Sequence, residues 1–331
     1  EQNKQNLTKI IFPAVIIILF IIPITMPENN TWLTWSDFPP SILNGGSAYS
    51  NFASDDWSSA MMWVRGNIAE DAVIASWWDY GYWITTLGQR TTLVDNATLI
   101  DWQIKKVGYT LITNPENSWN ILSSDYTQDV SKYLGNENVL AFGGQIESEF
   151  NQDYLEKYGV PCEQIFKSEA QNLNVNERSC NPVTKGMNAD YLLIYLAGER
   201  FFSDGNIPIY TLEGGGDESK KTWYAKISNH QVSKFIEDDN ITPTPYYMEN
   251  STLGMLTPFS IFKYVEPNTG RTFDKYQSGL IPVYVNDLKF KDPENDPFYL
   301  VYASPSFYNQ QPGVMSAVLI YKINHDYIPQ N

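Results

Sequence analysis

Five consecutive residues, Trp77-Trp78-Asp79-Tyr80-Gly81, bring together side chains that could bind one small hydroxyl group. A hydroxyl has one donor and two acceptor lone pairs. Two indole N–H donors and one carboxylate acceptor are its complement, so Trp77, Trp78 and Asp79 could satisfy a Ser or Thr side chain completely. A site of this kind rejects ligands that lack the hydroxyl by as much as ~10⁴–10⁵-fold, because its own polar groups are then left unpaired.

The two indoles can converge only if the chain turns at this point, since adjacent residues of a regular strand face opposite ways. Gly81 is expected to make such a turn easier. Residues 72–76, just before the motif, are apolar and predict a short buried strand. Open α/β sheets place their binding sites at the ends of such strands. The alternative interpretation is a Trp-rich corner of the core, in which Asp79 caps a helix.

A helix is expected upstream of this strand. Ser54 is a plausible N-cap, and Asp55 and Asp56 would favour the first turn. Apolar side chains then recur at the spacing of one helical face: Trp57, Met61, Val64 and Ile68.

Further elements extend this α/β pattern. Residues 90–95 predict a second short strand, and residues 102–111 predict a helix. Residues 190–197 are a continuous apolar run, typical of a central strand buried on both faces. Beyond residue 240, short β-rich runs are separated by Pro, Asn and Gly clusters, with no convincing helix between them.

The N-terminal part contains a membrane-spanning candidate. Residues 10–26 carry no charge and would span roughly 25 Å as a helix. Lys4 and Lys9 precede this run, so the positive-inside rule places the chain after about residue 27 on the extracytoplasmic side. A signal peptide is the alternative, but no Ala-x-Ala-like cleavage site follows. We therefore expect a mixed α+β and α/β protein in three parts: a transmembrane helix in residues 1–27, a helix-rich α/β core domain in residues 28–239 and a β-rich peripheral unit in residues 240–331.

Composition narrows the possible partners. The net charge is −16, which argues against nucleic acid, because that affinity depends on basic residues that neutralise phosphates. Aromatic residues make up 15% of the chain, which indicates recognition at a surface or a layer next to a membrane. Cys162 and Cys180 are too few for a zinc site; they could form a disulfide or remain free thiols.

The motif resembles the signature pentapeptide of the catalytic subunit of oligosaccharyltransferases, the membrane enzymes of asparagine-linked glycosylation. Ser54-Asp55-Asp56-Trp57 is similar to the segment upstream of that motif in archaeal members. Residues 90–96 resemble the segment that follows it, and the membrane-spanning candidate in residues 10–26 resembles the family's last transmembrane helix. The resemblance therefore implies the C-terminal part of an archaeal-type enzyme.

The resemblance also implies a second element downstream. The family has an Asp, a Lys three residues later and apolar residues further along the same helix. Asp217 and Lys220 fit this pattern in a helix that would open at Asp217 and run through Ile227. Tyr224 departs from the pattern, because many relatives carry Met or Ile there. The glycines at 214–216 are expected to form a loop before the helix, since they lack the spacing of a phosphate-binding loop.

The implied activity is transfer of an oligosaccharide from a lipid-linked donor to the asparagine of Asn-x-Ser/Thr in an acceptor protein. In the family, acidic residues and a divalent metal, Mn or Mg, act on the amide and the leaving phosphate. Those acids lie on external loops of a multi-pass membrane domain, so no catalytic residue and no metal ligand is expected in this chain. The partners would be the acceptor protein, the lipid-linked donor and the membrane, with other subunits left open.

The site residues implied by the resemblance bind substrate. The hydroxyl of the sequon Ser or Thr would be bound by Trp77, Trp78 and Asp79. Tyr80 and Gly81 would shape the turn. Support from the neighbouring helix would come from Asp217, Lys220 and Ile227, and Ile227 would favour Thr by contacting its methyl group.

Two other classes of protein remain possible from the sequence. A membrane-anchored carbohydrate- or peptide-binding module at the cell surface would use the tryptophans to stack on sugars. A secreted hydrolase would use Asp55, Asp56 and Asp79, but no nucleophile–His–acid set supports it. The two histidines, His230 and His325, fall in unrelated stretches and are expected at the surface.

Overall fold

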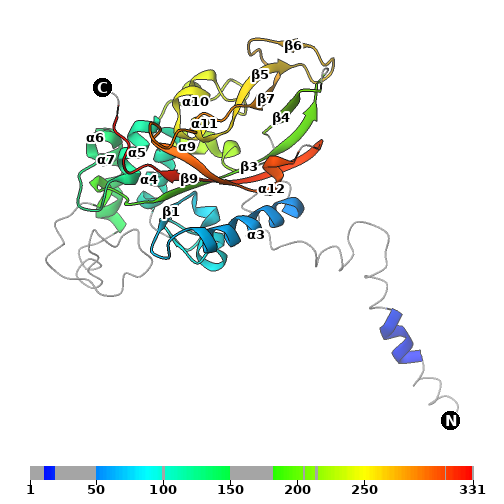
Figure 1. The fold of residues 1–331 in the computed structure, drawn as a ribbon, viewed down its shortest axis with the longest axis horizontal. Helices are drawn as coiled ribbons and strands as arrows, with labels where there is room; N and C mark the ends of the chain where they lie inside the picture. Colours follow the sequence, from blue (N-terminus) through cyan, green and yellow to red (C-terminus); the bar gives the residue numbers. More distant parts are fainter. Residues whose placement is uncertain are drawn as a thin grey trace, which may run out of the picture.

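The structure is a computed structural model of the chain that describes residues 11–18, 50–98, 101–149, 182–203, 206–212, 215–309 and 311–329. The side chains of residues 50–54 and 143–149 are outside this description. The centre of the described part is one sheet of nine strands with helices packed around it (Figure 1). The expected mixture of α and β structure is therefore confirmed.

The strands lie in the order β2-β1-β3-β4-β7-β5-β6, while β9 pairs with the other edge of β3 and β8 pairs with β9. Only the pairs β1–β2 and β1–β3 are parallel among the described strands. The strand bounds are Val73–Ala75 (β1), Thr91–Thr92 (β2), Tyr191–Phe202 (β3), Pro208–Thr211 (β4), Phe259–Val265 (β5), Thr272–Phe273 (β6), Ile281–Asn286 (β7), Phe298–Ala303 (β8) and Gly313–Ile323 (β9).

Helices precede, separate and cover these strands. In Figure 1, α3 lies on one side of β3 and β9, and α9, α10 and α11 lie on the opposite side. The α-helix bounds are Ser50–Asn67 (α3), Asp101–Ile112 (α4), Pro115–Ser123 (α5), Ser131–Leu134 (α6), Asn136–Glu149 (α7), Lys221–Ile227 (α9), Pro245–Asn250 (α10), Thr252–Leu256 (α11) and Pro305–Tyr308 (α12). The shorter 3-10 and π segments are Trp78–Tyr80 (η2), Trp83–Leu87 (η3), Pro182–Thr184 (η6), Glu218–Lys220 (η7) and Val232–Lys234 (η8).

The predicted central strand is confirmed. Residues 192–197 of β3 are all buried, and β9 pairs with β3 along most of its length, from Tyr191↔Lys322 to Arg200↔Gly313. This pairing corrects one expectation. The strands after residue 240 belong to the same sheet as the core, and short helices interrupt them, so the change in sequence texture at residue 240 is not a break in the sheet. Antiparallel pairing between distant segments leaves no trace in local composition.

The predicted short strands and helices upstream are present. The apolar face expected on the first helix is buried, with Trp57 and Val64 fully inaccessible. The helix begins at Ser50, however, so Ser54 is an interior residue and not its N-cap. The two predicted short strands are β1 and β2, which pair in parallel. The helix predicted in residues 102–111 is α4.

Two buried charges tie distant segments together. Asp56, 2% exposed, accepts hydrogen bonds from the Ser306 backbone N–H at 2.9 Å and from the Ser306 hydroxyl, which fixes the start of α12. Burial raises the pKa of Asp56, and the bonds from Ser306 oppose that shift. Arg200, 1% exposed, donates to the carbonyls of Ser306 at 2.9 Å and Gln311 at 3.1 Å. The segment that resembles the family's Ser-Asp-Asp-Trp element therefore has a structural role here.

Several expectations concern residues that the structure does not describe. Of the membrane-spanning candidate in residues 10–26, only residues 11–18 are described; they are helical and exposed. No helix among the described residues is long and apolar enough to cross a membrane. Cys162 and Cys180 lie outside the described residues, so their pairing stays a prediction.

The buried amine of Lys106 predicts a pH-dependent stability. Lys106 is inaccessible on α4, its Nζ donates to the Lys185 carbonyl, and burial lowers its pKa to about 7. Between pH 7 and the ordinary lysine value the unfolded state binds more protons, so stability rises with pH there. Chemical denaturation of the wild type and Lys106→Met from pH 7 to 9 should show the wild type gaining up to about 1.4 kcal/mol per pH unit over the variant. Parallel pH profiles would contradict this.

Candidate functional site

The site forms at a gap in the pairing of β3. On one edge of this strand, β1 pairs at Tyr191 and Leu192 and β4 pairs from Glu199 to Phe202. Between them Asp217 takes the place of a strand. Its backbone N–H donates to the Tyr195 carbonyl at 2.7 Å, and its carboxylate accepts the Tyr195 N–H at 2.8 Å. One residue therefore pairs both backbone groups of Tyr195.

Glycine permits this close approach. Gly216 precedes Asp217 with φ +79°, and a Cβ there would lie 2.4 Å from the Tyr195 carbonyl oxygen. The expected glycine loop thus has a definite purpose in its described part, Gly215 and Gly216, both of which have positive φ. It delivers Asp217 to the strand edge.

The aromatic motif leaves the end of β1 at the same place. Trp77 is still extended, with φ −62° and ψ 144°, and the chain then turns through η2. The turn therefore starts at Trp78. Gly81 is right-handed, with φ −56° and ψ −40°, a backbone conformation that other residues also adopt. Its role is space, because a Cβ at Gly81 would lie 2.3 Å from the Cβ and 2.4 Å from the Cα of Asp95.

A salt bridge joins the motif to the downstream element. The Lys220 amine lies 2.6 Å from Asp79 Oδ2, across 141 residues of sequence, and it also donates to the Tyr80 hydroxyl at 3.0 Å. The side chains of Asp79 and Lys220 are each 18% exposed. Partial burial and the charge-assisted hydrogen bond make this contact stronger than an ordinary surface ion pair.

Tyr224 completes the contact on the buried side. Its hydroxyl donates to Asp217 Oδ1 at 2.7 Å, and its ring meets the Trp77 ring edge-on, with centroids 4.8 Å apart. Burial raises the pKa of Tyr80 and Tyr224, and the charge of Asp217 raises both further, so both hydroxyls remain protonated donors. Burial also raises the pKa of Asp217, while the charge of Lys220 opposes that shift. Sequence reasoning noted Tyr224 only as a departure; its polar partner could not be inferred from a local pattern.

The two tryptophans of the motif differ in exposure. Trp77 is 3% exposed, whereas Trp78 is half-buried, and their ring centroids lie 6.3 Å apart. Within the described residues, neither indole N–H has a hydrogen-bond partner. The ring of Trp77 does belong to the core, as the alternative interpretation expected. Asp79, in contrast, lies inside η2 and binds Lys220, so it caps no α-helix.

Ile227 lies at the far end of α9, partly buried. A Cβ on Gly108 of α4 would approach Ile227 Cδ1 to 2.6 Å and Trp77 Cζ3 to 3.4 Å, so these two side chains border the same glycine. The helix expected to run from Asp217 to Ile227 is in fact divided. A 3-10 turn, η7, comes first, and α9 begins at Lys221.

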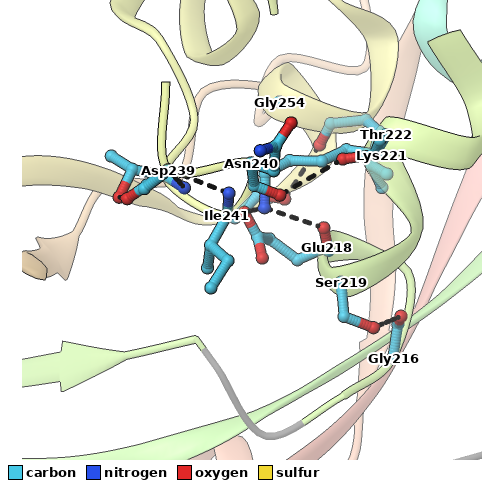
Figure 2. Close-up of polar contacts among 12 residues, drawn as sticks. Gly216, Glu218, Ser219, Lys221, Thr222, Asp239, Asn240, Ile241 and Gly254 are labelled. Carbon is cyan, nitrogen blue, oxygen red and sulfur yellow. Dashed lines mark hydrogen bonds and ion pairs between the residues drawn. The ribbon is translucent and has the colours of Figure 1, made fainter. Parts of the chain in front are cut away.

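Polar contacts fix the start of α9 (Figure 2). Lys221 and Glu218 form a buried ion pair at 2.7 Å, with side chains 3% and 6% exposed. The Ser219 hydroxyl donates to the Gly216 carbonyl at 2.8 Å, and the Thr222 hydroxyl lies 3.5 Å from the Asn240 carbonyl. These contacts hold Lys220 in place between the glycine loop and the turn at residues 239–241.

The residues considered for a hydrolase do not assemble. The carboxylate of Asp56 is bound by Ser306 and that of Asp79 by Lys220, while Asp55 is exposed. His230 was expected at the surface but is half-buried, stacked on Tyr109 with centroids 5.7 Å apart, and burial lowers its pKa. The side chain of His325 is 41% exposed, as expected. In the described part of the chain, no three His, Cys, Asp or Glu side chains gather in a group that could hold a metal ion.

The motif lies in a segment that is similar to a known protein family. Residues 69–174 match the model of the STT3/PglB/AglB core domain. The chain is 39% identical over 97 residues to the STT3B subunit of the dolichyl-diphosphooligosaccharide–protein glycosyltransferase of Arabidopsis thaliana, and 34% identical over 125 residues to the STT3 subunit of Saccharomyces cerevisiae. These alignments cover 28% and 37% of this chain but only 13% and 17% of the relatives.

The crystal structure of the C. jejuni PglB C-terminal domain aligns with 81% of this chain and 99% of its own, at 14% identity and a TM-score of 0.29. A similarity at that level carries no argument about the fold. The sequence match in residues 69–174 is therefore what relates this chain to the glycosyltransferase subunits, and it includes the whole of the aromatic motif.

The space around Gly81 predicts a specific sensitivity. Gly81→Ala should lower the free energy of unfolding by about 1–3 kcal/mol or more, because the new methyl group would clash with the Cα and Cβ atoms of Asp95. Gly66→Ala is the matched control, since a Cβ there meets nothing within 4 Å and alanine favours the helix by up to about 1 kcal/mol. Denaturant unfolding of both variants tests this; equal stability of the two would contradict it.

The Tyr224 hydroxyl predicts a second effect on stability. Tyr224→Phe should destabilise the protein by about 1–3 kcal/mol, because the buried Asp217 carboxylate loses a donor. Tyr246→Phe is a control on an exposed tyrosine and should change stability by less than about 0.5 kcal/mol. Thermal unfolding followed by near-UV circular dichroism measures both. A Tyr224→Phe protein as stable as the wild type would show that the hydrogen bond is dispensable.

Proposed function

We propose that this chain is the extracytoplasmic, C-terminal part of an archaeal-type oligosaccharyltransferase, and that it recognises the Ser or Thr of Asn-x-Ser/Thr acceptors. The whole enzyme would transfer an oligosaccharide from a lipid-linked donor to the acceptor asparagine. The match of residues 69–174 and the names of the relatives support the reaction class. The Ser-Asp-Asp-Trp element supports the archaeal type.

One observation carries the proposal, the contact of 2.6 Å between Lys220 and Asp79. The resemblance assigns these residues to one substrate site from two separate segments of sequence. Their meeting at a partly exposed position supports a shared role, since chance contacts between segments 141 residues apart rarely join the two expected residues.

The geometry suits a hydroxyl ligand. Lys220 occupies Oδ2 of Asp79, and within the described residues Oδ1 has no hydrogen-bond partner. The hydroxyl of a bound Ser or Thr would donate to Oδ1 and accept from the indole N–H groups of Trp77 and Trp78, which matches its one donor and two acceptors. Ile227, beside Trp77, would contact the threonine methyl and favour Thr over Ser by at most about 1 kcal/mol.

Bond formation would occur elsewhere in the enzyme. A divalent metal, Mn or Mg, would be bound by acidic residues outside this chain, and it would stabilise the leaving phosphate. The contribution of this chain is to hold the acceptor by a remote hydroxyl. Such binding energy positions the asparagine for reaction, so its loss lowers turnover as well as affinity.

The proposal predicts a strict dependence on the sequon hydroxyl. In the full-length membrane enzyme, an Asn-x-Thr peptide should bind at least tenfold more tightly than the matched Asn-x-Ala peptide. Asp79→Ala should remove that difference in affinity and abolish glycosylation. Asp79→Asn should reduce both the preference for the Thr peptide and the rate of glycosylation. Asp274→Ala, which removes an exposed carboxylate paired with Lys263, is the control and should leave glycosylation unchanged.

Two outcomes would refute the assignment. One is equal binding of the Thr and Ala peptides to the wild-type enzyme, which a general carbohydrate- or peptide-binding module would also show. The other is near-normal turnover by Asp79→Ala. Thermal unfolding of each variant establishes that a loss of activity does not come from a loss of fold.

A further inference from the structure

Trp223 is the exposed tryptophan of the described residues. Its side chain is 55% accessible, whereas every other tryptophan that the structure describes is buried or half-buried. Trp223 has neither a hydrogen bond nor a ring contact to another described residue. An indole ring has a large apolar surface, and exposing it to water is unfavourable. Single exposed apolar side chains are common on protein surfaces, so it is the position of Trp223 beside the candidate site that makes it a candidate for binding.

The position of Trp223 adjoins the Asp79–Lys220 salt bridge. Trp223 follows Lys220 by three residues and precedes Ile227 by four, so these three side chains form a ridge along one side of α9, from its N-cap at Lys220 to its last residue, Ile227. Tyr224, on the other flank of this ridge, is buried against Trp77.

Both ends of this ridge contact the motif segment. Lys220 binds Asp79 at one end, and Ile227 lies beside Trp77 at Gly108 at the other. Trp223 is between them in sequence and is the member of the three that is open to solvent. Because Lys220 joins Asp79 to this ridge, the residues that flank a hydroxyl bound at Asp79 would lie within reach of the indole.

We propose that Trp223 binds the side chain of an acceptor residue adjacent to the sequon Ser or Thr and thereby favours acceptors with a large apolar or aromatic residue there. This inference rests on the proposed function of the Asp79 site. The hydroxyl supplies the fixed point, and Trp223 supplies a flat apolar surface with one free N–H donor for the flanking side chain. It is a specificity-determining residue with no part in bond formation.

The chemistry of the surface favours an apolar flanking side chain. The charge of Lys220 is already paired with Asp79, so this lysine does not attract an acidic side chain to the indole. Lys226, exposed on the following turn, lies beyond Trp223 and would favour an acidic residue further from the sequon. The immediate neighbour of the bound hydroxyl therefore meets an aromatic surface.

Peptide binding to the full-length enzyme tests this inference. The probes are Asn-x-Thr-z peptides in which x and z are both Gly, x alone is Phe or z alone is Phe. With the wild type, one Phe-containing peptide should bind at least fivefold more tightly than the Gly peptide. Trp223→Ala should remove that gain and leave binding of the Gly peptide within about twofold, while Trp223→Phe should restore most of the gain. Met62→Ala, an exposed apolar residue on α3, is the matched control and should change nothing.

The outcomes separate this inference from the proposed function. If the Thr peptides bind no better than their Ala counterparts, the proposed function fails whatever Trp223 does. If the Thr preference holds but Trp223→Ala weakens all three peptides equally, or weakens none, the flanking-residue role is wrong. In the second case the exposed indole would serve a different contact, such as another subunit or the bilayer surface.

Discussion

The position of the site depends on one interaction, the pair of hydrogen bonds between Asp217 and Tyr195 at the open edge of β3. A buried strand edge needs partners for its N–H and C=O groups, because each unpaired group costs roughly 1–3 kcal/mol. Asp217 supplies both partners, so no further strand is needed between β1 and β4. The chain that leaves β1 can then turn across this edge, and the turn that follows Asp217 carries Lys220 to Asp79. Both ends of the salt bridge are therefore fixed by the same short stretch of strand.

The same interaction explains why so many polar side chains are buried here. A desolvated carboxylate is tolerated only when its oxygens are paired. One oxygen of Asp217 accepts the Tyr195 amide, the other accepts the Tyr224 hydroxyl, and the charge of Lys220 favours the ionised form. Because burial raises the pKa of the Tyr80 and Tyr224 hydroxyls, both keep their protons, and Tyr224 can donate its hydrogen bond to Asp217. Both oxygens of the buried Asp217 carboxylate therefore have partners. The partly exposed Asp79 is then the position where a ligand can bind.

Local patterns predicted the elements of this fold, and the distant pairings had to come from the structure. The apolar run at 190–197 and the helical spacing of Trp57 and Val64 report burial directly, and both were correct. The pairing of β9 with β3 involves residues more than a hundred positions apart, so no local pattern reports it and residue 240 was mistaken for a boundary. At the site, the Asp79–Lys220 pair was expected only through the family resemblance. The need for a residue without a side chain at position 81 was not predicted, because the residue that crowds it, Asp95, approaches only through the tertiary fold.

Hydroxyl selectivity at this site would depend on the different partners of the two carboxylate oxygens of Asp79: Lys220 for one and the ligand for the other. A free carboxylate accepts hydrogen bonds in many geometries and discriminates poorly between ligands. Lys220 occupies one oxygen and holds the group in a single orientation, so the remaining oxygen presents a directed acceptor. Ile227 ends α9, which follows Lys220 directly, so the apolar half of threonine recognition and the charge that orients Asp79 come from adjoining segments. Since the buried Glu218–Lys221 pair holds the start of α9, selectivity for the hydroxyl and for the methyl group would be coupled through the packing of α9 against α4.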